Sequence, residues 1–238
     1  MMGKCLPQRG VVVLTREFLK SADCQSSFGP IEESLLLSTE QRTESLHQFL
    51  LNKPTKGPLW VFGYGSLMWN PLLDHDRVET AHLEGWSREF CLSLIAGRGT
   101  AEAPGRMLAL VKGGSTTGLA FKLCCESWES ELALLWKREM LTGCYRPLWQ
   151  PLTLESGEVI EALVFVANPQ HCLFKIKESM ACQARIIASA QGPLGKNLTY
   201  LQEMVVTFQR YGIQEPTLTA LTEYAAQLSM EMSATTSE

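Results

Sequence analysis

Short runs of branched and aromatic residues fill the middle of the chain, and glycine and proline separate them. Such runs are typical of β-strands. The pattern predicts strands at 59–62, 78–86, 89–95, 106–111, 119–124, 148–154 and 159–166. The last two are joined across residues 155–158, where Gly157 is available for a tight turn.

Apolar residues recur at helical spacing in the other segments of the chain. This spacing predicts helices at 38–51, 127–141, 178–190, 198–211 and 217–230. Most strands come first and most helices gather after them. We therefore predict the α+β class, with a curved or barrel-like sheet flanked by helices.

The first fifty-odd residues differ in pattern from the rest. We interpret residues 1–55 as an N-terminal helical extension whose last helix docks on the main body through Leu46, Phe49 and Leu50. Pro54 and the Gly-Pro pair at 57–58 mark the boundary. The main domain then covers residues 56–232, and the small polar residues 233–238 form a tail that we expect to fray.

Charge and hydropathy exclude several classes of partner. The chain has 238 residues, 45% of them hydrophobic, and a formal net charge of −4. This charge gives no electrostatic footprint for nucleic acid or for an anionic membrane. A membrane-spanning helix needs ~20 consecutive apolar residues, and no stretch approaches that length. We therefore expect a protein that binds neither nucleic acid nor membrane.

Cysteine usage bears on metal, redox chemistry and compartment. The eight cysteines form no C-x-x-C pair, and no histidine cluster has ligand spacing. Neither a zinc site nor a redox dithiol is predicted. The apolar run at 11–14 is too short for the core of a signal peptide. Free thiols in the reducing cytoplasm are the simpler interpretation, and we expect no metal.

A glycine-rich loop follows the first predicted strand. Gly63 and Gly65 flank Tyr64, which lets the backbone turn sharply and present N–H groups to a carboxylate, phosphate or oxyanion. A dinucleotide fingerprint would need glycine at position 68, which is Met68. A nucleophile elbow would need glycine two residues before and two residues after Ser66, where Tyr64 and Met68 stand. No Walker motif is present. An anion-binding loop and a simple tight turn both remain open.

One carboxylate lies on the apolar side of the predicted helix 127–141. At about 100° per residue, Glu139 falls in the middle of the arc formed by Trp128, Leu132, Leu135 and Trp136. Glu131 lies outside the centre of this arc, and Arg138 points elsewhere. Apolar surroundings raise the pKa of a carboxyl group towards the range useful for proton transfer near neutrality. The alternative is a structural glutamate satisfied by backbone N–H groups or by an arginine such as Arg88, Arg98, Arg106, Arg146 or Arg185.

Several short motifs then resemble one family, the ChaC-type γ-glutamylcyclotransferases of the glutathione-specific kind. The resemblance spans roughly residues 59–212, and the order and spacing of its motifs are highly specific. The motifs are V-F-G-Y-G-S-L at 61–67, G-W-S-R-E-F at 85–90, R-G at 98–99, P-G-R at 104–106, R-E at 138–139 and G-P-x-G-x-N-x-x-Y-L at 192–201. Where relatives often have Gly-Gly-Tyr, this chain has G-C-Y at 143–145.

The resemblance implies a small mixed β-barrel flanked by helices, which works without metal or cofactor. It implies that Glu139 is the general acid and base. The residues it implies for binding the γ-glutamyl group are Val61, Phe62, Gly63, Tyr64, Gly65, Ser66 and Leu67. Further candidates for substrate contacts are Arg88, Tyr145 and Tyr200.

The reaction that the resemblance implies is intramolecular. The α-amine of glutathione attacks the γ-carbonyl, and the products are 5-oxoproline and Cys-Gly. Because the substrate carries its own nucleophile, the missing serine or cysteine signature is explained. A cyclotransferase for other γ-glutamyl peptides or amines and a non-catalytic regulatory binding protein remain open, and the sequence does not indicate an oligomeric state.

Overall fold

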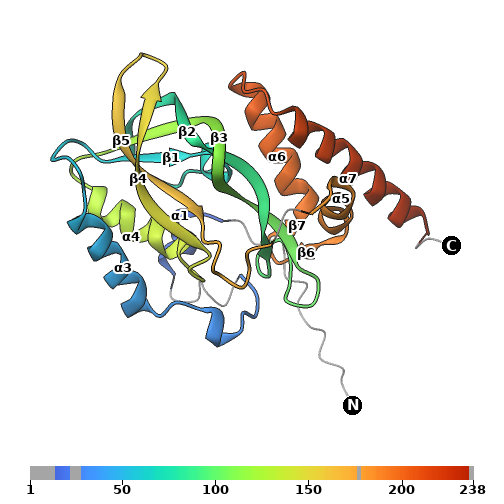
Figure 1. Cartoon of the computed structure of the whole chain (residues 1–238). Coiled ribbons are helices and arrows are strands. Elements are labelled where there is room, and N and C mark those ends of the chain that lie inside the picture. The colour runs from blue at the N-terminus through green and yellow to red at the C-terminus, as the bar shows by residue number, and fades with distance from the viewer. Residues whose placement is uncertain (1–13, 22–27, 176–177, 236–238) are drawn as a thin grey trace.

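Five strands form a closed barrel in the computed structural model, which describes residues 14–21, 28–175 and 178–235 (Figure 1). Their order around the barrel is β1-β3-β2-β4-β5. The β1 and β5 strands pair in parallel and close the barrel, whereas the other pairs are antiparallel. The strand bounds are β1 (Trp60–Gly63), β2 (His75–Leu94), β3 (Gly105–Leu123), β4 (Tyr145–Leu154) and β5 (Val159–Ala167). The predicted mixed barrel with flanking helices is confirmed.

Strands β2 and β3 are each longer than the sequence pattern predicts. The pattern splits each of them in two, but both pair continuously in one long antiparallel ladder. The register shifts between Glu84 and Trp86, close to Gly85, and the partner strand holds Gly113 and Gly114 there with positive φ. The glycines at 113–114 are therefore part of a bulge in one ladder, not a turn that ends a strand, and the polar residues 87–88 of β2 pair in regular register with β3.

Strand β1 lies between two hydrophobic core clusters. Leu59 and Val61 belong to one cluster, and Trp60 and Phe62 belong to the other. Helices α3 (Thr39–Leu51) and α4 (Trp128–Glu139) pack against the first cluster. Helices α5 (Met180–Ser189), α6 (Asn197–Arg210) and α7 (Pro216–Thr235) pack against the second, on the opposite side of the molecule in Figure 1. Burial on both faces explains the continuous hydrophobic run that begins the domain.

The described part of the N-terminal extension contacts the barrel, and its last helix docks through Leu46, Phe49 and Leu50. Its described elements are α1 (Arg16–Lys20), η1 (Glu33–Leu35) and α3. The Phe49 ring stacks on Trp149 with centroids 4.3 Å apart and lies 5.2 Å from the Trp136 ring. This aromatic contact fixes α3 against α4 and β4.

The C-terminal third differs from the prediction at two points. A short hairpin of β6 (Gln191–Gly192) and β7 (Gly195–Lys196) connects α5 to α6. Helix α7 continues to Thr235, so helix covers the start of the segment predicted to fray. Within this last turn the Ser233 hydroxyl donates a hydrogen bond to the Ser229 carbonyl at 2.8 Å.

Two further expectations concern membrane-spanning helices and the state of the cysteine thiols. Among the described residues, no helix is long and apolar enough to cross a bilayer. The thiols of Cys91, Cys124, Cys125, Cys144, Cys172 and Cys182 are free. Cys5 and Cys24 lie outside the described residues.

Candidate active site

Three segments that are far apart in the sequence meet around one cavity. They are the glycine loop after β1, the C-terminal end of α4 and the first turn of α6. The cavity has a volume of about 1130 Å³, and Ser66, Glu139 and Tyr200 all line it. The two features that the sequence singled out independently are thus brought together.

The glycine loop turns directly into a 3₁₀ helix, η2 (Ser66–Met68). Its internal bonds run from the Met68 amide to the Gly65 carbonyl at 2.9 Å and from the Asn70 amide to the Ser66 carbonyl at 3.0 Å. The amides of residues 65–67 find no acceptor within the described part of the chain. Free N–H groups at the start of such a turn can bind a carboxylate or an oxyanion, so the structure favours the anion-binding interpretation of this loop.

Gly63 is required by close packing at the end of β1. A Cβ atom there would lie 2.9 Å from Cε2 of Phe121 and 3.1 Å from Cβ of Leu67. At Gly65 the nearest atom would be the Tyr200 hydroxyl oxygen, at an ordinary contact distance of 3.6 Å. The first glycine of the loop therefore packs the loop against β3, and the second leaves room beside Tyr200.

We expect Gly63→Ala to lower the free energy of unfolding by about 1–3 kcal/mol, the usual cost of forcing an extra carbon into a packed core. Urea unfolding measures this change. Gly57→Ala is the matched control, because a Cβ atom at Gly57 would meet only the Thr55 hydroxyl oxygen, at 3.6 Å. Equal stability of the Gly63→Ala variant and the parent would contradict the packing role.

Glu139 is the last residue of α4, and its side chain is 14% exposed. Burial raises the pKa of this carboxyl, and the neighbouring Arg138 guanidinium lowers it only in part. A carboxylate at a helix C-terminus also faces the negative end of the helix dipole. Oε1 is buried and receives no hydrogen bond from the described residues. The predicted inward direction is confirmed, and the carboxyl is poised to take up and release a proton.

Arg138 lies in the site, whereas the helical periodicity placed it elsewhere. Its side chain is only 6% exposed, and its Nε lies 3.0 Å from Glu139 Oε1 as an ion pair. Nη2 donates to the Ser66 hydroxyl at 2.9 Å, and Nη1 donates to the Asn70 carbonyl at 2.6 Å. The prediction was wrong because the glycine loop packs over the flank of α4 and covers a position outside the apolar arc.

None of the arginines that the sequence offered as structural partners of Glu139 is paired with it. Arg88, Arg98 and Arg106 form ion pairs with Glu215, Glu203 and Glu178, respectively. The structure gives Arg146 and Arg185 no ion pair among the described residues. The charge next to Glu139 comes from its own sequence neighbour.

Three tyrosines surround Glu139, but only one of them lines the cavity. The Tyr64 hydroxyl donates to the Phe165 carbonyl at 2.7 Å, and the Tyr145 hydroxyl donates to the Leu108 carbonyl at 2.8 Å. Tyr200 lines the cavity. Burial raises the pKa of all three hydroxyls, and the charge of Glu139 raises it further. All three hydroxyls therefore stay protonated near neutrality, and Tyr200 is the one of the three residues that lines the cavity.

Arg88 lies behind the glycine loop and does not line the cavity. Its Nε donates to the Tyr64 carbonyl at 2.8 Å, and its two Nη groups bind the Thr117 carbonyl and Glu215. Its guanidinium carbon lies 4.6 Å from the centre of the Phe208 ring. Val61, Phe62 and Leu67 are likewise buried and lie outside the cavity lining. These residues support the loop from the core side.

Part of the cavity wall comes from residues that the sequence did not indicate. The N-terminal extension contributes Leu14, Thr15, Arg16, Glu17 and Phe28. Only the tertiary structure identifies them, because they lie outside the stretch that resembles the family. Among the described residues, no group of three His, Cys, Asp or Glu side chains is placed to hold a metal ion.

The family model described as "ChaC-like protein" matches residues 59–228. The chain belongs to the ChaC-like family. It is 51% identical over 209 residues to the glutathione-specific gamma-glutamylcyclotransferase of Escherichia coli (strain K12), covering 88% of this chain and 90% of that protein. The ChaC-like chain is also 30% identical to the human glutathione-specific gamma-glutamylcyclotransferase 1, over 74% of this chain and 81% of that protein.

Among solved structures, this ChaC-like chain is similar to a yeast gamma-glutamyl cyclotransferase specific to glutathione. The TM-score is 0.66 at 22% identity, covering 73% of this chain and 97% of the yeast chain. At this identity the likeness establishes the fold. The yeast structure therefore shares the fold of this chain.

Proposed function

We propose that this protein is a glutathione-specific γ-glutamylcyclotransferase, which cleaves glutathione into 5-oxoproline and Cys-Gly. The observation that carries the proposal is the buried Glu139 carboxyl, which lines the same cavity as the glycine loop. The high identity to the E. coli enzyme of this name supports the same substrate. We further propose residues 56–232 as the catalytic domain and the cytoplasm as its compartment.

The proposed reaction needs orientation and proton transfer but no nucleophile from the protein. The α-amine nitrogen of glutathione bonds to the γ-carbonyl carbon, and the amide bond to the cysteine nitrogen breaks. Glu139 accepts a proton from the amine and returns one to the departing nitrogen. Holding the amine about 3 Å from the carbonyl supplies several kcal/mol of the rate enhancement.

The remaining site residues have distinct roles in this proposal. The free amide of Ser66, the member of residues 65–67 that lines the cavity, holds a carboxylate of the substrate or the developing oxyanion. The Tyr200 hydroxyl, which lies beside Gly65 of the loop, donates to the substrate. Arg88, Tyr64 and Tyr145 act as positioning residues, because their polar groups bind the protein's own backbone.

The direct test is formation of 5-oxoproline by the purified protein, measured by chromatography with glutathione and γ-Glu-Ala as parallel substrates. We expect Cys-Gly and 5-oxoproline from glutathione, and a much lower rate with γ-Glu-Ala. Preference for γ-Glu-Ala would indicate a cyclotransferase for other γ-glutamyl peptides. Binding of glutathione without product would indicate a non-catalytic binding protein.

The pH dependence of kcat/KM for glutathione reports on Glu139. Only the carboxylate form accepts a proton, and burial raises the pKa of this group. We therefore expect kcat/KM to fall as the pH decreases through that raised pKa, at a pH above the usual range of an exposed glutamate. An acidic limb at the ordinary glutamate pKa would contradict the role of burial.

A further inference from the structure

The N-terminal extension forms part of the active-site wall through two segments, residues 14–17 and Phe28. Residues 14–17 line the cavity together with Glu139. Phe28 also lines it, and the Phe28 carbonyl accepts a hydrogen bond from the Gly97 amide at 2.7 Å. The rings of Phe18 and Phe28 are in edge contact, with centroids 5.3 Å apart. The family model begins at residue 59, so this wall lies outside the matched region.

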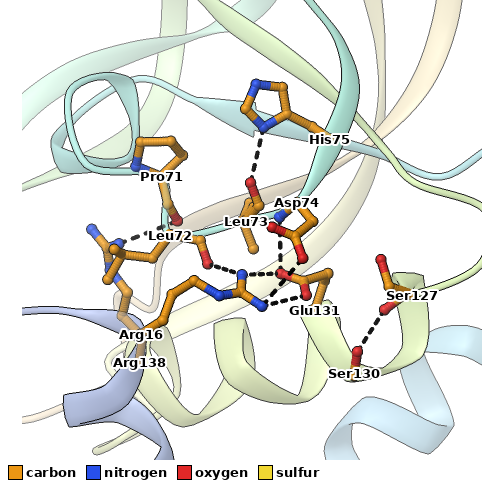
Figure 2. A network of polar contacts seen from close by, with 10 residues as sticks. All are labelled: Arg16, Pro71, Leu72, Leu73, Asp74, His75, Ser127, Ser130, Glu131 and Arg138. Carbon is orange, nitrogen blue, oxygen red and sulfur yellow. Dashed lines mark hydrogen bonds and ion pairs between the residues drawn. The ribbon is translucent and has the colours of Figure 1, made fainter.

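One buried ion pair fastens this extension to α4. Arg16 binds Glu131 with both terminal nitrogens, at 2.6 and 2.7 Å, and Figure 2 shows its guanidinium reaching from α1 to that carboxylate. Glu131 is only 1% exposed although it lies outside the centre of the apolar arc. Desolvation raises its pKa, but the hydrogen bonds from Arg16 and from the Asp74 amide outweigh this effect and leave the pKa below its usual value. Glu131 is therefore charged, and among the described residues its ion-pair partner is Arg16 of the extension.

The same pair holds the segment 70–74, which we call the clamped loop. Arg16 Nη1 donates to the Leu72 carbonyl at 2.8 Å, and the Asp74 amide donates to Glu131 Oε2 at 3.0 Å. Leu72 has a φ of 53°, which is disfavoured for leucine, and no other non-glycine residue of the described chain has a positive φ. Such a conformation persists only where surrounding contacts impose it.

Arg138 also binds the clamped loop. It donates to the Asn70 carbonyl at 2.6 Å, and the Asn70 amide group donates to the Leu14 carbonyl at 3.1 Å. Arg138 is also the ion-pair partner of Glu139, at 3.0 Å. A continuous series of contacts therefore runs from Arg16 through the clamped loop and Arg138 to the catalytic carboxyl.

We propose that Arg16 is a positioning residue for the reaction, which acts by holding the clamped loop so that Arg138 stays against Glu139. This inference rests on the proposed function of Glu139. Without Arg16, Glu131 loses its ion pair and Leu72 loses a contact that imposes its backbone conformation. The Asn70 carbonyl then shifts, and Arg138 moves away from Glu139. Because the carboxylate form of Glu139 is then stabilised less, the pKa of Glu139 rises.

The test compares Arg16→Met and Arg16→Lys with the parent. We expect Arg16→Met to lower kcat for glutathione by roughly 2- to 30-fold and to move the acidic limb of kcat/KM to higher pH. Arg16→Lys keeps a charge near Glu131 but cannot form the two-pronged pair, so it restores part of kcat. Arg77→Met is the control, because Arg77 pairs with two carboxylates, Glu79 and Glu158, as Arg16 pairs with Glu131 and Asp74, but lies outside the cavity lining. Its kcat and pH profile should equal those of the parent.

A second measurement does not depend on turnover. The Glu139 carboxyl is followed by carbon-13 NMR, with its signal assigned by Glu139→Gln, and we expect a higher pKa in Arg16→Met than in the parent. Should Arg16→Met fail to fold, Glu131→Gln takes its place and should shift the titration in the same direction. An inactive parent with this titration shift would overturn the proposed function alone. An unchanged titration, or a change in KM only, would overturn the positioning role of Arg16.

Discussion

Glu139→Gln is expected to keep the fold and to reduce kcat for glutathione by about 100- to 10,000-fold, the usual contribution of a general acid–base group. Glutamine has nearly the same shape as glutamate but cannot accept the proton of the α-amine. Turnover is measured as 5-oxoproline released per enzyme, and binding is measured by isothermal titration with glutathione. Retention of more than a tenth of the parent's kcat would contradict the role of Glu139.

The same variant has a second readout in its stability. Burial raises the folded-state pKa of Glu139 above its unfolded value, so the folded protein binds the proton more tightly. The contribution of Glu139 to the free energy of unfolding is then present at low pH and is lost as the pH rises through the folded-state pKa. We therefore expect Glu139→Gln to be at least as stable as the parent at pH 7. Glu129→Gln, an exposed change on the same helix, is the control for both readouts.

Arg88→Met is expected to lower the free energy of unfolding by about 3–5 kcal/mol, the usual cost of removing one partner of a buried ion pair. The side chain is 2% exposed, and its loss leaves Glu215 and the Tyr64 and Thr117 carbonyls without their partner. Because the Tyr64 carbonyl belongs to the glycine loop, we also expect kcat/KM to fall. Urea unfolding and initial rates measure the two effects.

The result distinguishes the two interpretations of Arg88. A direct substrate contact, for which the sequence made Arg88 a candidate, predicts a stable variant with a raised KM. Support of the loop from behind predicts a destabilised variant. Arg77→Met is the control, because its ion pairs lie nearer the surface and such pairs contribute about 0–1 kcal/mol.

The strand pattern predicted where strands occur better than where they end. Strand β1 and the hairpin of β4 and β5 follow the predicted ranges closely. The breaks predicted within β2 and β3 were wrong: residues 87–88 of β2 pair in regular register with β3, and the glycines at 113–114 of β3 form a bulge where the sequence equally allowed a turn. Whether such glycines form a bulge or a turn depends on whether the partner strand continues to pair. A single stretch of sequence does not contain that information.

By itself, the sequence determined the class of fold, the glycine loop after β1 and the inward direction of Glu139. Each of these follows from local periodicity or from the conformational freedom of glycine, which act within a few residues. Only the tertiary structure decided that the loop and Glu139 share a cavity, that Arg138 joins them, and that Arg88 supports the loop. It also decided that Arg16 closes one wall of that cavity. These contacts join segments that are far apart in the sequence; Arg16 and Glu131, for example, are 115 positions apart. Packing between distant segments, and not the local pattern, determines which surfaces such segments cover.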